Sequence, residues 1–285
     1  MIKNAIISTA ELEMVLDNPD WVVVDCRFDL QDSDWGYHTY LAGHIPFANY
    51  AHLNHDLSSK ISQSTGRHPL PKEADFSKAL SNWGIEPSTN VVVYDSNGGA
   101  FAARLWWMLC MIHHPSVYVL NGGIPKWEKE GRKLQSGSWP KASKNYGPVK
   151  YDQNMYATTA EVWKLLNKPD TLLIDARTPE RYHGEIEPID TLAGHIPSAL
   201  NRFHGLNLES DGTFKDPSAL RAEFSDLFQQ FSSKDTVVYC GSGVTSCHHL
   251  LAMRIAGFEE GRIYIGSWSE WIRDPNRPRL PDNQY

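Results

Sequence analysis

The residues most able to do chemistry form one short run, Cys-Gly-Ser-Gly-Val-Thr-Ser, at positions 240–246. A cysteine attacks as its thiolate, and an ordinary thiol is mostly protonated at neutral pH. Glycine-containing loops can turn successive backbone N–H groups toward an anion, and a following helix adds partial positive charge. The run therefore predicts a nucleophile with a lowered pKa at Cys240. We expect Cys240 to be catalytic, and Gly241, Gly243, Val244 and Thr245 of the same loop to bind the substrate.

The other cysteines are Cys26, Cys110 and Cys247, and none of the four forms a Cys-x-x-Cys pair. Free cysteine is commonly buried and inert, which is the role expected for Cys26 and Cys110. Cys247 could resolve an oxidised Cys240 as a disulfide, although core packing is favoured for it. This spacing predicts reduced thiols in a cytoplasmic protein that needs no metal and no cofactor.

The elements that must position the loop occur in two copies of one pattern. STAELEMVLDNPDWVVVDCR at residues 8–27 matches TTAEVWKLLNKPDTLLIDAR at 158–177 without a gap. LAGHIP occurs at 41–46 and again at 192–197. Two copies at so long a period indicate a duplicated domain rather than a solenoid.

The two copies differ where the loop chemistry lies. NVVVYD at 90–95 matches DTVVYC at 235–240, so Asp95 stands at the position of Cys240. In open α/β sheets, ligands collect at the carboxyl ends of the strands, and both residues follow a strand-like run. Only the second copy offers a nucleophile there. We therefore expect a catalytic C-terminal domain and an inactive N-terminal one.

Short β-branched runs such as VVVD and VVVY alternate with helical stretches in each copy, including long helices predicted at 98–113 and 243–256. The alternation predicts an α/β fold of two tandem domains, each a parallel sheet with helices on both faces. A chain of 285 residues is long enough for two such cores. We place the domains at 1–138 and 157–285, joined by a polar linker at 139–156.

The charge balance narrows the possible partners. The formal net charge is −7 and the pI is about 5.9. Nucleic acids and anionic membranes attract basic surfaces, so neither is expected as a partner. The sequence also contains no apolar stretch long enough to span a bilayer and no secretory signal.

The duplicated architecture, VVVDCRF, both GHIP motifs, YCGSGVTS and GSWSEW together resemble the two-domain rhodanese family along essentially the whole chain. The similarity is to its 3-mercaptopyruvate and thiosulfate sulfurtransferases. This resemblance implies a two-step covalent cycle. Cys240 would take the outer sulfur of a small anionic donor and become a persulfide, and a thiol or cyanide would then accept that sulfur.

The loop bears on the donor. In thiosulfate-preferring rhodaneses the two residues after the cysteine are typically basic, whereas here they are Gly241 and Ser242, as in the mercaptopyruvate enzymes. This resemblance implies that Ser242 is catalytic and donates a hydrogen bond to the donor's carbonyl or helps to move a proton. Arg181 matches the family arginine that clamps the anionic end of the donor. The alternative for Arg181 is a surface ion pair with Glu185 or Glu187. The family's second arginine, a few residues further on, is missing, so thiosulfate remains an alternative donor and His183 a possible substitute.

His44 and Asp34 resemble residues proposed to form a proton relay with the loop serine in mercaptopyruvate enzymes, which makes His44 a candidate substrate-site residue. The repeat favours another role, because His195 occupies the same place in the second copy. By the same reasoning, the repeated Asp25-x-Arg27 and Asp175-x-Arg177 pairs are expected to be structural. Trp268 and Trp271 are expected to pack the end of the sheet.

Three other functions compete with sulfur transfer to a small acceptor. A cysteine phosphatase needs Cys-x5-Arg, and the sixth residue after Cys240 is Ser246. A non-catalytic binding module would lack the cysteine in both copies. A persulfide relay to a partner protein would use the same chemistry at Cys240, so it stays open.

Overall fold

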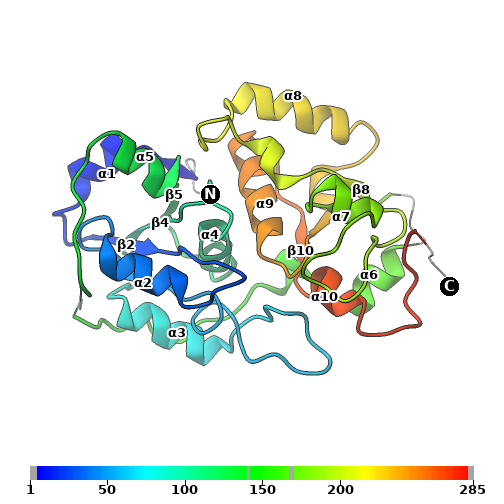
Figure 1. Ribbon diagram of the computed structural model, residues 1–285, viewed down its shortest axis with the longest axis horizontal. Helices are drawn as coiled ribbons and strands as arrows, with labels where there is room; N and C mark the ends of the chain where they lie inside the picture. The colour runs from blue at the N-terminus through cyan, green and yellow to red at the C-terminus, as the bar shows by residue number, and fades with distance from the viewer. Residues whose placement is uncertain (1–4, 140–141, 167, 169, 282–285) are drawn as a thin grey trace. The chain divides into compact units, whose positions relative to one another are not determined.

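The computed structural model describes residues 5–139, 142–166, 168 and 170–281, and Figure 1 labels the helices and several of the strands. The chain forms two compact units. The first unit consists of Met1–Ser59, Leu70–Tyr151 and Leu208–Phe214, and the second of Lys60–Pro69, Asp152–Asn207 and Lys215–Tyr285.

The two units differ from the predicted domain boundaries in three places. Lys60–Pro69, although it lies within the N-terminal half of the sequence, is part of the second unit. Leu208–Phe214 is part of the first unit. The second unit begins at Asp152, inside the stretch 139–156 that was predicted as a linker. Neither exchanged segment has a hydrophobic period that reveals which core it joins.

Each unit contains a five-stranded sheet whose strand pairings are all parallel, as predicted. The strand order is β1-β5-β4-β2-β3 in the first unit and β6-β10-β9-β7-β8 in the second. The strands of the first unit are β1 (Ile6–Ile7), β2 (Trp21–Asp25), β3 (Asn49–Tyr50), β4 (Asn90–Tyr94) and β5 (Val117–Leu120). Those of the second are β6 (Tyr156–Ala157), β7 (Leu172–Asp175), β8 (Leu200–Asn201), β9 (Thr236–Tyr239) and β10 (Arg262–Tyr264).

Helices cover both faces of each sheet because the central strands are apolar on both sides. In the first unit, Val23 and Val92 pack in one core cluster with Leu12, Tyr40 and Trp127. Those three residues belong to α1 (Thr9–Val15), α2 (Trp35–Ala42) and α5 (Gly123–Lys129). The first unit also contains α3 (Glu73–Asn82) and α4 (Ala102–Met111), and α4 packs against β4 and β5.

The second unit repeats this arrangement. Val162, Trp268 and Trp271 pack with Leu173 and Tyr239 in one cluster, so the two tryptophans are core residues, as predicted. The helices that contribute to this cluster are α6 (Thr159–Leu165), α7 (Pro179–His183) and α10 (Ser267–Trp271). The remaining helices are α8 (Pro217–Leu227) and α9 (Thr245–Ile255), which pack against each other, and α9 also contacts β9. Short 3₁₀ turns lie at Gln153–Met155, His204–Asn207 and Ser233–Asp235.

The sequence correctly predicts how the helices α1 and α6 begin. Ser8 and Glu11 form a capping box, as do Thr158 and Glu161. The predicted long helices begin later than expected, at Ala102 and Thr245. The reason is local, since the residues before them include glycines in the left-handed region, with φ of 64° at Gly98 and 76° at Gly243.

The repeated ion pairs are structural, as predicted. Arg27 binds the carboxylate of Asp25 and donates to the Gly43 carbonyl at 2.6 Å. Arg177 binds Asp175 and donates to the Gly194 carbonyl at the same distance. Each pair is buried and ties the first residue of its GHIP motif to the last residue of a strand inside the sheet.

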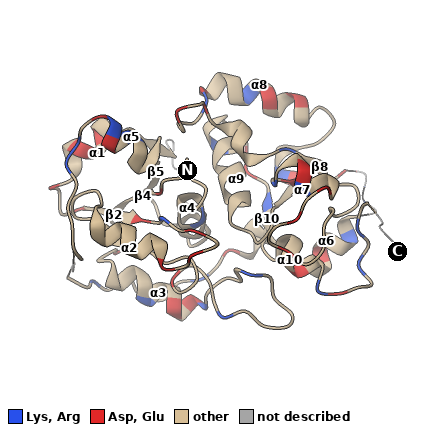
Figure 2. Ribbon diagram, in the orientation of Figure 1, with Lys and Arg blue, Asp and Glu red and all other residues tan. Residues whose placement is uncertain are grey.

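Lys and Arg are interspersed with Asp and Glu along the ribbons of both units (Figure 2). Within the described residues, no helix is both long and apolar enough to cross a bilayer.

Candidate active site

Cys240 is the first residue after β9, and its side chain is 2% exposed. The backbone N–H of Gly243 donates to its sulfur at 3.2 Å, and the Ser246 hydroxyl lies 3.7 Å from the same atom. Its own N–H donates to the Ser267 hydroxyl at 3.1 Å. The loop thus curls around the sulfur and directs donors at it, as the glycine pattern predicts.

These donors change the acidity of the thiol. Burial by itself would raise the pKa of Cys240, because it disfavours the charged thiolate. The hydrogen bond from the Thr245 side chain and those from the backbone N–H groups of Ser242 and Ser246 outweigh burial, so the pKa of Cys240 lies below its ordinary value. The loop therefore stabilises a thiolate at a buried position.

Cys26 provides the internal contrast. It is also buried, but burial together with the negative charges of Asp25 and Asp95 raises its pKa well above the ordinary value. Cys110 and Cys247 are likewise buried and form no disulfide. Cys247 donates to the Gly243 carbonyl at 3.4 Å, so it packs under the loop.

This contrast predicts selective alkylation. At pH 7, iodoacetamide should modify Cys240 first, because thiolate is the reactive form and only a lowered pKa leaves much of it at that pH. Replacing Thr245 with valine removes the largest stabilising bond, so the midpoint of the alkylation rate against pH should move upward. Peptide mapping gives the site, and Cys240→Ser is the control that should lose the fast phase. Equal labelling of Cys26 would contradict the prediction.

The matching loop of the first unit holds a carboxylate instead of a thiol. Asp95 follows β4 and accepts hydrogen bonds from four backbone N–H groups at 2.7–2.9 Å. Those N–H groups belong to Asn97, Gly99, Phe101 and Ala102. The backbone N–H groups of this loop are therefore bound by the loop's own carboxylate, at the position that matches Cys240.

Glycine is required at two positions of the Cys240 loop, for a different reason at each. Gly243 has φ of 76° and its α-carbon faces the Ile265 carbonyl, so a side chain is excluded both by backbone strain and by space. Gly241 does not have a positive φ. A Cβ there would lie 2.8 Å from a terminal nitrogen of Arg67 and 3.5 and 3.6 Å from two nitrogens of Arg181. Two guanidinium groups thus lie beside the residue that follows Cys240.

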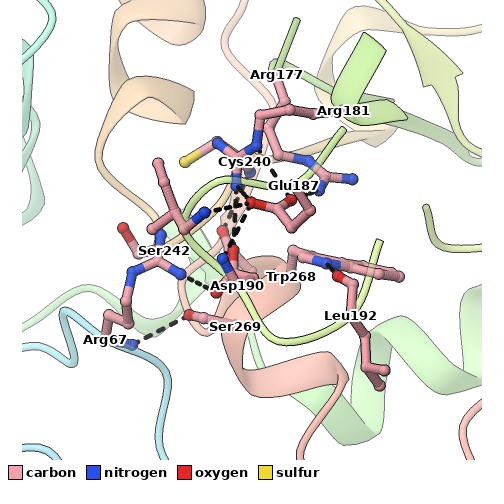
Figure 3. Close-up of polar contacts among 12 residues, drawn as sticks. Arg67, Arg177, Arg181, Glu187, Asp190, Leu192, Cys240, Ser242, Trp268 and Ser269 are labelled. Carbon is pink, nitrogen blue, oxygen red and sulfur yellow. Dashed lines mark hydrogen bonds and ion pairs between the residues drawn. The ribbon is translucent and has the colours of Figure 1, made fainter. Parts of the chain in front are cut away.

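Arg67 and His68 were not predicted from the sequence. They lie on Lys60–Pro69, the segment that joins the second unit. One ring nitrogen of His68 lies 2.7 Å from the Ser242 hydroxyl, and His68 is 5% exposed. The Arg67 side chain forms an ion pair with Asp190 (Figure 3). No counterpart of this segment was recognised in the repeat, so only its polar pair Arg-His could have drawn attention to it.

Arg181 lies at the site but has partners of its own. It donates to Glu187 at 2.7 Å and to Asp190 at 3.1 Å (Figure 3). The ion pair with Glu187 is one of the two that the sequence left open as an alternative role for Arg181. The Arg181 side chain forms this ion pair and also lies beside Gly241. Glu187 and Asp190 stand where the resemblance led us to expect a second arginine. His183, the suggested substitute, is exposed and packs edge-on against Tyr182.

His44 and its counterpart in the repeat, His195, have matching partners within their own units. His44 is fully buried in the first unit, stacks on Tyr40 and bonds the Tyr40 carbonyl at 2.8 Å. His195 does the same with Tyr182 in the second unit. Asp34 is exposed and precedes α2, and the GHIP motif begins directly after this helix. The eight residues of α2 span about 12 Å, so Asp34 and the GHIP turn lie at opposite ends of the helix. The GHIP histidines therefore order a turn, and the histidine that contacts Ser242 is His68.

Comparisons with known proteins agree with this architecture. The rhodanese-like domain family matches the chain twice, over residues 8–130 and 158–274. A probable 3-mercaptopyruvate sulfurtransferase from Pseudomonas aeruginosa is 42% identical over 277 residues, covering 96% of each chain. A thiosulfate sulfurtransferase from Rattus norvegicus is 34% identical over 240 residues, covering 82% of this chain and 79% of that one.

Among solved structures, a 3-mercaptopyruvate sulfurtransferase from Leishmania major superposes with a TM-score of 0.81 at 29% identity. The match covers 94% of this chain and 74% of that protein. Both rhodanese-like regions lie on the two repeats found in the sequence. The chain belongs to the rhodanese family and has two copies of its domain.

Proposed function

We propose that this protein is a sulfurtransferase that takes a sulfur atom from 3-mercaptopyruvate onto Cys240 and passes it to a thiol or to cyanide. The observation that carries the proposal is the Cys240 thiol, whose sulfur accepts from the Gly243 N–H at 3.2 Å within a loop that lowers its pKa. The names of the sequence relatives support the same class of reaction.

In the first half-reaction the Cys240 thiolate attacks the sulfur of the donor. The new S–S bond forms as the carbon–sulfur bond breaks, and the electron pair of that bond passes into the enolate of pyruvate. The proton of the donor thiol ends on the methyl carbon of pyruvate, which leaves Cys240 as an anionic persulfide. The N–H groups that favour the thiolate would stabilise this second anion in the same way.

In the second half-reaction an acceptor removes the outer sulfur. Cyanide attacks that sulfur, the S–S bond breaks, and thiocyanate leaves while Cys240 returns as a thiolate. A thiol acceptor would receive the sulfur as its own persulfide. Charge and atoms balance in each half-reaction, so no cofactor is required.

Ser242 and His68 are assigned to the donor's carbonyl and to proton transfer. The Ser242 hydroxyl lies 2.7 Å from His68, so the histidine can orient it. A hydroxyl held this way can donate to the carbonyl oxygen, on which negative charge grows as the enolate forms. Arg181 is assigned to the donor's carboxylate, because a guanidinium fork can bind both of its oxygens.

The thiols support a cytoplasmic location. All four cysteines are buried, and none is part of a disulfide. A persulfide cycle with free thiols needs a reducing environment, and we therefore place the protein in the cytoplasm.

The proposal is tested by steady-state assays with 3-mercaptopyruvate and with thiosulfate, using cyanide as acceptor and thiocyanate as the product measured. We expect kcat/KM to favour mercaptopyruvate by tenfold or more, which is about 1.4 kcal/mol of transition-state binding. The reverse ratio would make thiosulfate the donor. Slow turnover with both donors but rapid loss of sulfur to a protein acceptor would identify a persulfide relay.

A further inference from the structure

The segment Lys60–Pro69 is held to the second unit at a defined place. The backbone N–H of Arg67 donates to the Ser269 hydroxyl at 3.0 Å, and that of Gly66 donates to Glu270 at 3.3 Å. Gly66 is so close to α10 that a Cβ there would lie 2.5 Å from the Gly266 carbonyl oxygen. The backbone that carries Arg67 is therefore fixed against the helix beside the catalytic loop.

The Arg67 guanidinium is placed against that loop rather than in solvent. Its side chain is 21% exposed, and one terminal nitrogen lies close to Gly241. Its Nε–H is buried and has no hydrogen-bond acceptor among the residues that the structure describes. A buried donor without an acceptor is unfavourable, so the position favours a ligand that supplies an oxygen.

Asp190 lies between Arg67 and Arg181 (Figure 3). One carboxylate oxygen pairs with Arg67 and the other with Arg181, and the Asp190 side chain is only 4% exposed. With Glu187 on Arg181 as well, the positive charge beside Gly241 is largely balanced by fixed carboxylates. A donor with one negative charge adds less repulsion from these carboxylates than a donor with two.

We propose that Arg67 is a donor-binding residue, the second guanidinium of the carboxylate site, and that Asp190 positions it and matches the site to a singly charged donor. This inference rests on the proposed sulfurtransferase function. It assigns to Arg67, far away in the sequence, the role of the arginine that is missing after Arg181. It also makes Asp190 a determinant of the choice between mercaptopyruvate and thiosulfate.

The first test replaces Arg67 with methionine, which keeps the length of the side chain and removes its charge. KM for 3-mercaptopyruvate should rise about tenfold or more, and Arg67→Lys should recover part of the loss. The rate at which a neutral thiol removes sulfur from the preformed persulfide should stay within twofold, because no donor carboxylate is present in that step. Arg262→Met, which breaks an ion pair with Glu161, is the matched control and should leave KM unchanged.

The second test replaces Asp190 with asparagine, which removes the charge and keeps the shape. The ratio of kcat/KM for thiosulfate to that for mercaptopyruvate should rise about tenfold. An equal loss for both donors in Asp190→Asn, or an equal loss in both half-reactions in Arg67→Met, would show that the pair only anchors the segment and would overturn the inference. An unchanged KM in Arg67→Met would overturn it as well.

The activity of the wild-type protein distinguishes a failure of this inference from a failure of the proposed function. If the wild-type protein forms no thiocyanate from either donor, the sulfurtransferase proposal itself fails. If the wild-type protein is active and both Arg67→Met and Asp190→Asn behave like the control Arg262→Met, the proposed function stands. Only the roles assigned to Arg67 and Asp190 are then wrong.

Discussion

Replacing Cys240 with serine is expected to abolish sulfur transfer, with a loss on the order of 10⁴-fold or more, while the protein remains folded. The serine hydroxyl is far less acidic than the thiol and cannot form a persulfide, so the surrounding loop would hold an unreactive group. The wild-type protein should gain the mass of one sulfur atom when it is mixed with donor in the absence of acceptor. The serine variant should not gain that mass.

The matched control for this prediction is Cys26→Ala. Cys26 is equally buried, but its pKa is raised rather than lowered, so it should contribute nothing to the chemistry. Its replacement should leave kcat within about twofold for the fraction of protein that is folded. Transfer at the wild-type rate by the Cys240 variant would sink the assignment of the nucleophile, because another cysteine would have to carry the sulfur.

Replacing Asp95 with alanine is expected to destabilise the first unit by about 3 kcal/mol or more. The carboxylate accepts from four backbone N–H groups, which would lose their acceptor in a buried loop. A denaturant titration followed by tryptophan fluorescence measures the effect. The chemistry at Cys240 should persist at denaturant concentrations where the variant is still folded.

Asp29→Ala is the comparison in the same unit. Asp29 is exposed and accepts from a single backbone N–H, that of Gln31, at 2.7 Å, so its loss should cost about 1 kcal/mol or less. If the two alanine variants are equally stable, the four hydrogen bonds of Asp95 do not hold the loop as argued. The contrast would then fail to explain why the first copy holds a carboxylate.

Much of the fold could be predicted because its signals are local. The capping boxes at Ser8 and Thr158 and the β-branched strand runs depend on neighbouring residues. The helix starts were misplaced because left-handed glycines such as Gly98 and Gly243 prolong the loops, and the sequence does not reveal which glycine takes that conformation.

The site could be predicted only in part. Cys240 was found because its loop is contiguous and follows a recognisable strand. His44 was named as a candidate by resemblance and His68 was not predicted, since no short-range pattern connects His68 with Ser242, 174 residues away. The predicted domain boundaries also missed that Lys60–Pro69 belongs to the second unit. Such a contact depends on a surface formed by residues that are distant in the sequence.

The sequence by itself determined the duplicated α/β architecture, the asymmetry between Asp95 and Cys240, and the loop that surrounds the nucleophile. Each of these depends on residues that are close along the chain or repeated in it. The tertiary structure decided which histidine contacts Ser242, which arginine stands beside Arg181, and that Asp190 lies between the two guanidinium groups. These features arise from the docking of a segment on α10, so they depend on long-range packing that no local pattern encodes.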